Sequence, residues 1–232
     1  MPNSEVNPRN EDDLHSFFFG RTTKPLLAIA SLFDALIPIA SPFELKAADT
    51  FHFAPTRDDA SIMLLNNGVC SVCHGESDLV KTTVFAPSVL GLIDGYGSFY
   101  DVPISPRQYI FAETVCTGYR VPLDLFVSTL DEKNLWHDVS RILAHRLIVM
   151  TIREREFVGT DSYVMVRTLL LELHSYPLEY REQINVLSFI QRRTNLSRSR
   201  IMSILSELRK GEYIAMHRGK LISVVSKLPA VF

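Results

Sequence analysis

The chain has 232 residues, 47% of them hydrophobic and 22% charged, and this balance is ordinary for a soluble globular protein of one large or two modest domains. Its beginning is polar and acidic, and the apolar run at 26–40 holds Asp34 and Pro38, which excludes a secretory signal and a bilayer span. Three cysteines without framework spacing exclude a cross-linked secreted domain. We therefore expect a cytoplasmic protein without a membrane partner.

The net charge of -2 divides unevenly along the chain. Residues 181–232 carry ten Lys or Arg against three Asp or Glu, a net charge of +7. The first 180 residues carry fourteen basic against twenty-three acidic residues, a net charge of -9. A small basic unit attached to a larger acidic one predicts a polyanionic partner for the basic unit, although a solvated basic face would give the same numbers.

Residues 1–22 predict a flexible lead-in, and the apolar spacing in 26–37 predicts a helix. Up to residue 130 the chain then consists of short runs of strand-forming residues, separated by clusters of Pro, Gly, Asp and Asn that indicate turns. These turn signals lie about ten residues apart. This spacing predicts a closed all-β unit, a jelly roll or a sandwich. The expected strands are Ser61–Leu65, Val69–His74, Leu79–Phe85, Tyr109–Cys116 and Tyr119–Val121.

Residues 131–158 predict one long helix. Its apolar residues step by three, four, four and three, as in a helix that pairs with a second helix, and they are Trp136, Val139, Leu143, Leu147 and Met150. This spacing favours a homodimer, but a helix packed inside its own domain would show the same pattern. A further helix is expected over 160–174, ended by Pro177.

Residues 184–210 have the pattern of a helix-turn-helix. In the second helix, apolar residues share one face, Ser197 is placed to cap the start, and Gly211 is placed to end it. Between the two helices Asn195 tolerates a left-handed backbone, which suits a tight turn. Two short runs joined by the turn at 217–220 predict a basic hairpin in the position of a wing.

A β-unit, a long pairing helix and a C-terminal winged helix in this order resemble the Crp/Fnr superfamily of bacterial transcription regulators. The closest local match is Leu196-Ser197-Arg198-Ser199-Arg200 followed by an apolar ladder, which is similar to the recognition helix of that superfamily. The resemblance implies an α+β fold, with a β-roll like that of cyclic-nucleotide-binding domains at 23–130, a dimerisation helix at 131–158 and a winged helix at 159–232.

By position, the resemblance implies that Arg198, Ser199 and Ser203 face base edges and that Arg200, Arg218 and Lys220 lie near phosphates. It also implies a homodimer on a pseudo-palindromic double-stranded DNA site, with RNA polymerase as a further partner and stress as a regulatory context. Arg198 has the geometry for a bidentate contact to guanine, whereas the two serines discriminate bases only modestly.

The resemblance fails where such regulators bind a cyclic nucleotide. Leu92 stands where the carboxylate for the ribose would be, and Gln108 and Tyr109 follow Arg107 where a small hydroxyl residue would be needed. Buried ligand hydroxyls without partners would cost on the order of 1–3 kcal/mol each. We therefore expect a degenerate sensor domain that does not bind cyclic nucleotides.

Cys70-Ser71-Val72-Cys73-His74 matches the C-x-x-C-H signature of haem attachment, but it lies in a predicted strand without an export signal. In a regular strand Cys70 and Cys73 point to opposite faces, so buried apolar cysteines are favoured. A thiol switch that also uses Cys116, or a haem sensor, stays as the alternative function. No metal spacing, phosphate loop or nucleophile motif is recognisable, so neither a cofactor nor an enzyme is expected. A third alternative is a winged helix that binds a protein rather than DNA.

Overall fold

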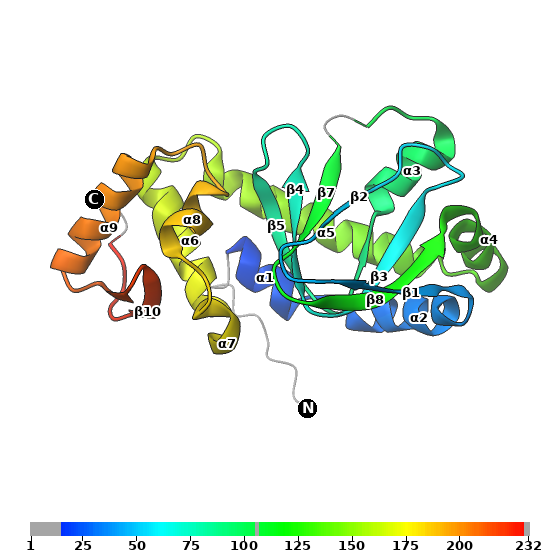
Figure 1. Ribbon diagram of the computed structural model, residues 1–232, viewed down its shortest axis with the longest axis horizontal. Coiled ribbons are helices and arrows are strands. Elements are labelled where there is room, and N and C mark those ends of the chain that lie inside the picture. Colours follow the sequence, from blue (N-terminus) through cyan, green and yellow to red (C-terminus); the bar gives the residue numbers. More distant parts are fainter. Residues whose placement is uncertain (1–14, 105–106, 230–232) are drawn as a thin grey trace. The chain divides into compact units, whose positions relative to one another are not determined.

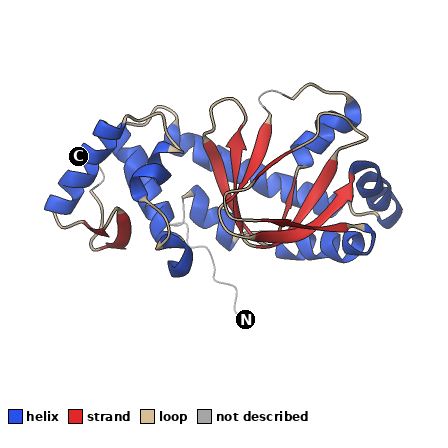
Figure 2. Cartoon of the chain, viewed as in Figure 1, coloured by secondary structure: helices blue, strands red, loops and turns tan. Residues whose placement is uncertain are grey.

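A computed structural model describes residues 15–104 and 107–229 (Figure 1). The chain divides into two compact units, one formed by Pro25–Ala144 and the other by Met1–Lys24 with His145–Phe232. The boundary between them falls inside one helix, α5 (Trp136–Phe157). Helix and strand are both abundant, so the predicted α+β class is confirmed (Figure 2).

The unit Pro25–Ala144 contains two four-stranded antiparallel sheets. The first has the order β1 (Ser41–Leu45), β8 (Cys116–Pro122), β3 (Ser61–Asn67) and β6 (Ser88–Leu90). The second has the order β2 (Thr50–His52), β7 (Gln108–Ala112), β4 (Val69–His74) and β5 (Val80–Phe85). Every pair of neighbouring strands runs antiparallel, as the predicted β-roll requires.

Both faces of the first sheet are buried. Ile62 and Leu64 of β3 belong to a core shared with helices, whereas Met63 and Leu65 belong to a core shared with the second sheet. Side chains alternate across a strand, so a strand that is covered on both faces must be apolar at every position. This explains why residues 62–65 form a continuous apolar run.

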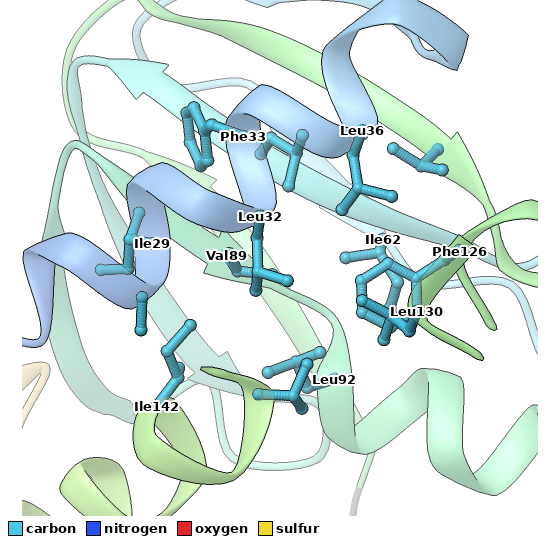
Figure 3. Packing of buried hydrophobic residues seen from close by; sticks show 14 of the residues in the cluster. Ile29, Leu32, Phe33, Leu36, Ile62, Val89, Leu92, Phe126, Leu130 and Ile142 are labelled. Carbon is cyan, nitrogen blue, oxygen red and sulfur yellow. The ribbon is translucent and has the colours of Figure 1, made fainter. Parts of the chain in front are cut away.

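The helical core combines α2 (Leu26–Leu36), α4 (Leu123–Lys133) and the start of α5 with the first sheet. A short 3-10 helix (Ile37–Ile39) follows α2, and α3 (Leu92–Tyr100) follows β6. Figure 3 shows the packing of this core, to which α2 contributes four of the labelled residues, Ile29, Leu32, Phe33 and Leu36. In the described residues no single helix is long and apolar enough to cross a membrane. The pair Ser16–Thr22 and Leu26–Ile39, bent by 59°, is long and apolar enough only when the two helices are taken together.

The second unit begins with α1 (Ser16–Thr22) and continues with the later half of α5 and α6 (Ser162–Ser175). Four short elements and one longer helix complete it: α7 (Leu178–Arg181), α8 (Val186–Gln191), α9 (Arg198–Lys210), β9 (Ile214–His217) and β10 (Lys220–Val224). The helices α8 and α9 form the predicted helix-turn-helix, and β9 and β10 form the predicted hairpin.

Three sequence predictions about the elements are wrong. Residues 1–14 of the expected lead-in lie outside the described residues, but Ser16–Thr22 is a helix that packs on α6. Local sequence could not predict this packing, because the partners of the helix lie far along the chain. The expected strand Tyr109–Cys116 is two strands, since the amides of Glu113 and Thr114 turn away to bond Val69 O at 2.9 and 3.2 Å. The long helix starts at Trp136 rather than 131, because Asn134 has a φ of 54° and ends α4.

Candidate DNA interface

The helix α9 presents one apolar face to the interior and one polar face to solvent. Ile201, Ile204, Leu205 and Leu208 are buried, as their helical spacing predicts. The Ser197 Oγ accepts a hydrogen bond from the Arg200 amide at 3.2 Å, which confirms the expected N-terminal cap. The polar face is exposed and includes Arg198, Ser199 and Ser203, three of the residues expected to read DNA.

Three side chains at the start of α9 make contacts within the protein. The Arg200 Nε donates to Ser162 Oγ at 2.7 Å, which joins the first turn of α9 to the first turn of α6. The hydroxyls of Ser197 and Ser199 lie 3.1 Å apart. The exposed Arg198 lies between Ser197 and Ser199 as the first residue of α9, and the first residues of such a helix contact base edges in a helix-turn-helix.

The turn between α8 and α9 is built from buried side chains, not from a left-handed residue. Asn195 is absent from the positive-φ residues of the described chain, so its expected left-handed conformation is wrong. Instead the Thr194 Oγ donates to Ile190 O at 3.0 Å and accepts from the Leu196 amide at 3.4 Å. The Arg193 guanidinium lies 3.7 Å from the centre of the Phe189 ring and donates to Phe189 O at 3.2 Å.

A buried ionic cluster lies beneath this turn, and sequence reasoning missed it. The Glu172 carboxylate of α6 accepts from Arg153 Nη1 at 3.1 Å and from Tyr176 Oη at 2.6 Å. Burial alone would raise the pKa of Glu172, but the charges of Arg153 and Arg193 and the Tyr176 hydrogen bond lower it below its usual value. The one sequence signal for the cluster was Glu172 in the middle of a helix, with Arg153 before it and Arg193 after it in the chain. Such charged residues usually lie at the surface.

The hairpin is fastened to the helix-turn-helix at its tip. Arg218 and Gly219 both have positive φ, 48° and 80°, as a two-residue hairpin turn requires. The Gly219 carbonyl accepts from the Val186 amide at 2.8 Å, so the turn is bonded to the start of α8. The exposed Arg218 in the turn and the exposed Lys220 at the start of β10 are therefore held in place by this bond.

Four of the five residues expected at a dimer interface are exposed along α5. The exposed fractions are 40% for Trp136, 41% for Leu143, 66% for Leu147 and 51% for Met150. Val139 is only 4% exposed and packs in the helical core, so its assignment to an interface is wrong. It steps from Trp136 by three residues like an interface position, but it belongs to the core that the first sheet shares with α2 and α4.

Aromatic side chains lie close to Gly91, the residue before the position expected for a ribose-binding carboxylate. A Cβ on Gly91, whose φ is 87°, would lie 2.6 Å from the Phe53 ring, and Phe51 packs edge-on against Phe53 at 5.3 Å. Both phenylalanines border the core between the sheets. Leu92, at the position expected for a ribose-binding carboxylate, belongs to the helical core instead. Leu92 thus supplies packing to the helical core and not a carboxylate.

The three cysteines are buried and form no disulfide. Cys70 pairs with Ala112 and Cys73 with Tyr109 in a regular β4–β7 register, so the two thiols point to opposite faces. Burial raises the pKa of the Cys116 thiol, which disfavours the reactive thiolate. Within residues 15–104 and 107–229, no group of three or more His, Cys, Asp or Glu is placed to hold a metal ion.

Comparisons with known proteins agree with this geometry. A family model described as winged helix-turn-helix DNA binding matches residues 162–230. The inhibitor of hydrogen peroxide resistance of Escherichia coli K12 is 30% identical over 209 residues, which cover 90% of this chain and 98% of that protein. The Salmonella typhimurium LT2 protein of the same description is also 30% identical, over 211 residues and with the same coverage.

Two solved structures share the fold at low sequence identity. The c-di-GMP-responsive global regulator CLP of Xanthomonas campestris has a TM-score of 0.65 at 14% identity, covering 85% of this chain and 100% of that one. A transcriptional regulator of the Crp/Fnr family from Eubacterium rectale has a TM-score of 0.66 at 14% identity, covering 85% and 91%. The expected likeness to Crp/Fnr regulators is therefore confirmed.

Proposed function

Since this chain belongs to the family of the inhibitor of hydrogen peroxide resistance, within the Crp/Fnr type of DNA-binding transcription regulators, we propose that it is a homodimer that recognises a pseudo-palindromic operator. The observation that carries the proposal is the exposed polar face of α9, headed by Arg198 and flanked by the fastened basic hairpin. A basic segment of +7 supplies the attraction to phosphates.

Within this interface, Arg198, Ser199 and Ser203 contact base edges, and Arg218 and Lys220 contact phosphates. Arg200 would contact both a phosphate and the protein, since its Nε already donates to Ser162 Oγ. A phosphate near Arg200 would therefore also fix the start of α6. One Arg and two Ser give a modest base code, with Arg198 supplying roughly 1–3 kcal/mol of discrimination for guanine.

The homodimer forms along the exposed apolar stripe of α5. Leu143, Leu147 and Met150 step by four and three residues and are each at least 41% exposed. An apolar helix stripe of this kind is stabilised by a second copy in a coiled-coil arrangement. The twofold axis would place the two α9 helices in successive major grooves, about 34 Å apart.

The β-roll acts as a scaffold without a cyclic-nucleotide ligand. The support is the aromatic and aliphatic filling around Phe51, Phe53 and Leu92. The relatives' name, inhibitor of hydrogen peroxide resistance, supports a role in the response to hydrogen peroxide. RNA polymerase is the further partner that we propose. A haem or thiol sensor at Cys70, Cys73 and His74 is not favoured, since both thiols are fully buried and diverge.

The test uses a duplex selected in vitro from a randomised pool by the wild-type chain. Arg198→Ala should abolish preference for the selected duplex over a random one while the dimer mass in light scattering stays unchanged. The affinity of the wild type should also fall steeply with salt, because each phosphate contact releases counterions. Unchanged preference in Arg198→Ala would refute the assignment of the reading helix.

A further inference from the structure

The helix α1 is far from the winged helix along the sequence, yet it packs in the compact unit that holds the winged helix. Its amino-terminal end is bound to α5. The Glu156 carboxylate accepts from the Ser16 amide at 3.0 Å and from the Ser16 hydroxyl, and its Oε1 lies 2.8 Å from His15 Nδ1. The Glu156 side chain is only 8% exposed, so these donors replace the water that a buried carboxylate would otherwise lose.

The other end of α1 is bound to α6. The Arg21 Nη1 donates to the carbonyl of Ser175, the last residue of α6, at 2.5 Å. A cation is favourable there because the carbonyls at a helix C-terminus carry partial negative charge. Between the two ends, Phe19 stacks on His145, and a Cβ on Gly20 would lie 3.3 Å from Val149 Cγ2. One short helix thus spans from α5 to the far end of α6.

The joint between α5 and α6 needs such a connection. Residues 158–161 link the two helices, and among them Gly159 has a φ of 72° and no atom within 4 Å of the place where a Cβ would lie. A glycine in this conformation offers little resistance to bending. The Arg153–Glu172 ion pair joins the two helices directly, and α1 also connects them through its contacts with both.

The contacts of α1 leave the proposed dimer stripe open. His145, Val149 and Glu156 are spaced by four and seven residues and share one face of α5. Leu143, Leu147 and Met150 lie about half a turn away and stay exposed. One face of α5 therefore carries α1, while the opposite face is available to a second copy of the chain.

We propose that α1 is a clamp that fixes the angle between α5 and α6, with Ser16 and Arg21 as positioning residues that present α9 correctly to the operator. This inference rests on the proposed function, because two recognition helices fit one operator only when each keeps a fixed angle to the dimer helix. A single unit bound to random DNA needs no such angle.

The first experiment compares Ser16→Ala/Arg21→Ala with Thr22→Ala in the full chain. The Thr22 hydroxyl donates only within α1, to Phe18 O and Phe19 O, which makes it the matched control. The double variant should bind the in-vitro-selected duplex roughly tenfold more weakly, as the loss of one or two charge-assisted hydrogen bonds predicts. Binding to a random duplex at low salt should be unchanged, as should every property of the control.

The second experiment restores the clamp covalently with Gly20→Cys/Val149→Cys, a pair chosen because a Cβ on Gly20 would lie 3.3 Å from Val149 Cγ2, and a disulfide needs such a close approach. When this pair is added to the double variant, oxidation should return operator affinity to the wild-type value, and reduction should lower it again. Equal affinity in the oxidised and reduced forms would overturn the proposal. So would loss of binding on oxidation of the otherwise wild-type chain, since α1 would then have to leave before DNA binds.

A separate readout distinguishes failure of the clamp from failure of the proposed function. Spin labels at the exposed positions Arg155 and Glu207 report the distance between α5 and α9 in dimers diluted with unlabelled chain. The distance distribution should broaden in the double variant and narrow again on oxidation of the cysteine pair. An unchanged distribution refutes the clamp, whether or not the wild type selects a duplex from the pool.

Discussion

The two units of this protein are filled in different ways. In Pro25–Ala144 the buried polar residues are hydroxyls, Ser71, Ser88, Ser98 and Thr129, set among aliphatic and aromatic side chains. The other unit buries the charged residues Glu172 and Arg193. An apolar core can relax around a small change in side-chain volume, whereas a buried charge is destabilised when any of its partners is removed. We therefore expect the β-roll to behave as a scaffold and the DNA-binding unit to depend on a few specific contacts.

The largest expected effect is on the ionic cluster. Glu172→Ala would leave Arg153 and Arg193 without the carboxylate that faces them, at a cost of about 3–5 kcal/mol in free energy of unfolding. Hydrogen exchange of the α6 amides should accelerate, while the single tryptophan, Trp136 in the other unit, should keep its fluorescence. Glu172→Gln removes the charge but keeps one carbonyl oxygen that accepts from Arg153, and its amide donates to Tyr176 Oη, so it should cost less. Equal exchange in wild type and Glu172→Ala would contradict this account of the unit.

A truncation in the scaffold is the matching change in the other unit. Leu130→Ala removes a fully buried side chain from the helical core and should lower stability by about 2–5 kcal/mol. Here Trp136 fluorescence should change at lower urea concentration, while the α6 amides exchange as in the wild type. Faster exchange in both units after either substitution would show that they unfold together, and the contrast between them would then have no thermodynamic meaning.

Acid should act on the two units with opposite sign. The pKa of Glu172 is lowered in the folded chain, so its stabilisation is present above the unfolded pKa and is lost as pH falls through the folded pKa. Burial raises the pKa of Asp94 on α3, so its contribution is full below the unfolded pKa and is lost as pH rises. When hydrogen exchange is measured from pH 7 downward, the α6 amides should lose protection before those of the β-roll. Asp94→Asn should remove the stability that the β-roll gains as pH falls.

Local signals made much of the DNA-binding unit predictable. The period of the apolar residues, the Ser197 cap and the Arg218-Gly219 turn each act within a few residues, so periodicity and turn chemistry were enough. The contacts of α1 were out of reach because Ser16 meets Glu156 across 140 positions of sequence. Glu172 and Arg193 were missed because a charged residue carries no local sign of burial.

Val139 shows a different limit. Its spacing from Trp136 and Leu143 is that of an interface, yet it packs in the core of its own unit. Core and interface positions on a helix share one periodicity, and only the positions of α2 and α4 separate them. The predicted strand through Tyr109–Cys116 failed for a similar reason, since the turn at Glu113 and Thr114 is set by Val69 on another strand.

The smallest expected effect is at the start of α9. Ser197→Ala removes the hydroxyl that accepts from the Arg200 amide, which should cost about 1 kcal/mol in stability. The cap also holds the first turn, where Arg198 lies, so preference for the selected duplex should fall slightly while binding to random DNA does not change. Ser206→Ala, at another exposed position of α9, is the control. If both variants lost the same stability, the cap would contribute nothing beyond helix propensity, and the anchoring of Arg198 would have to come from Arg200 and Ser162 alone.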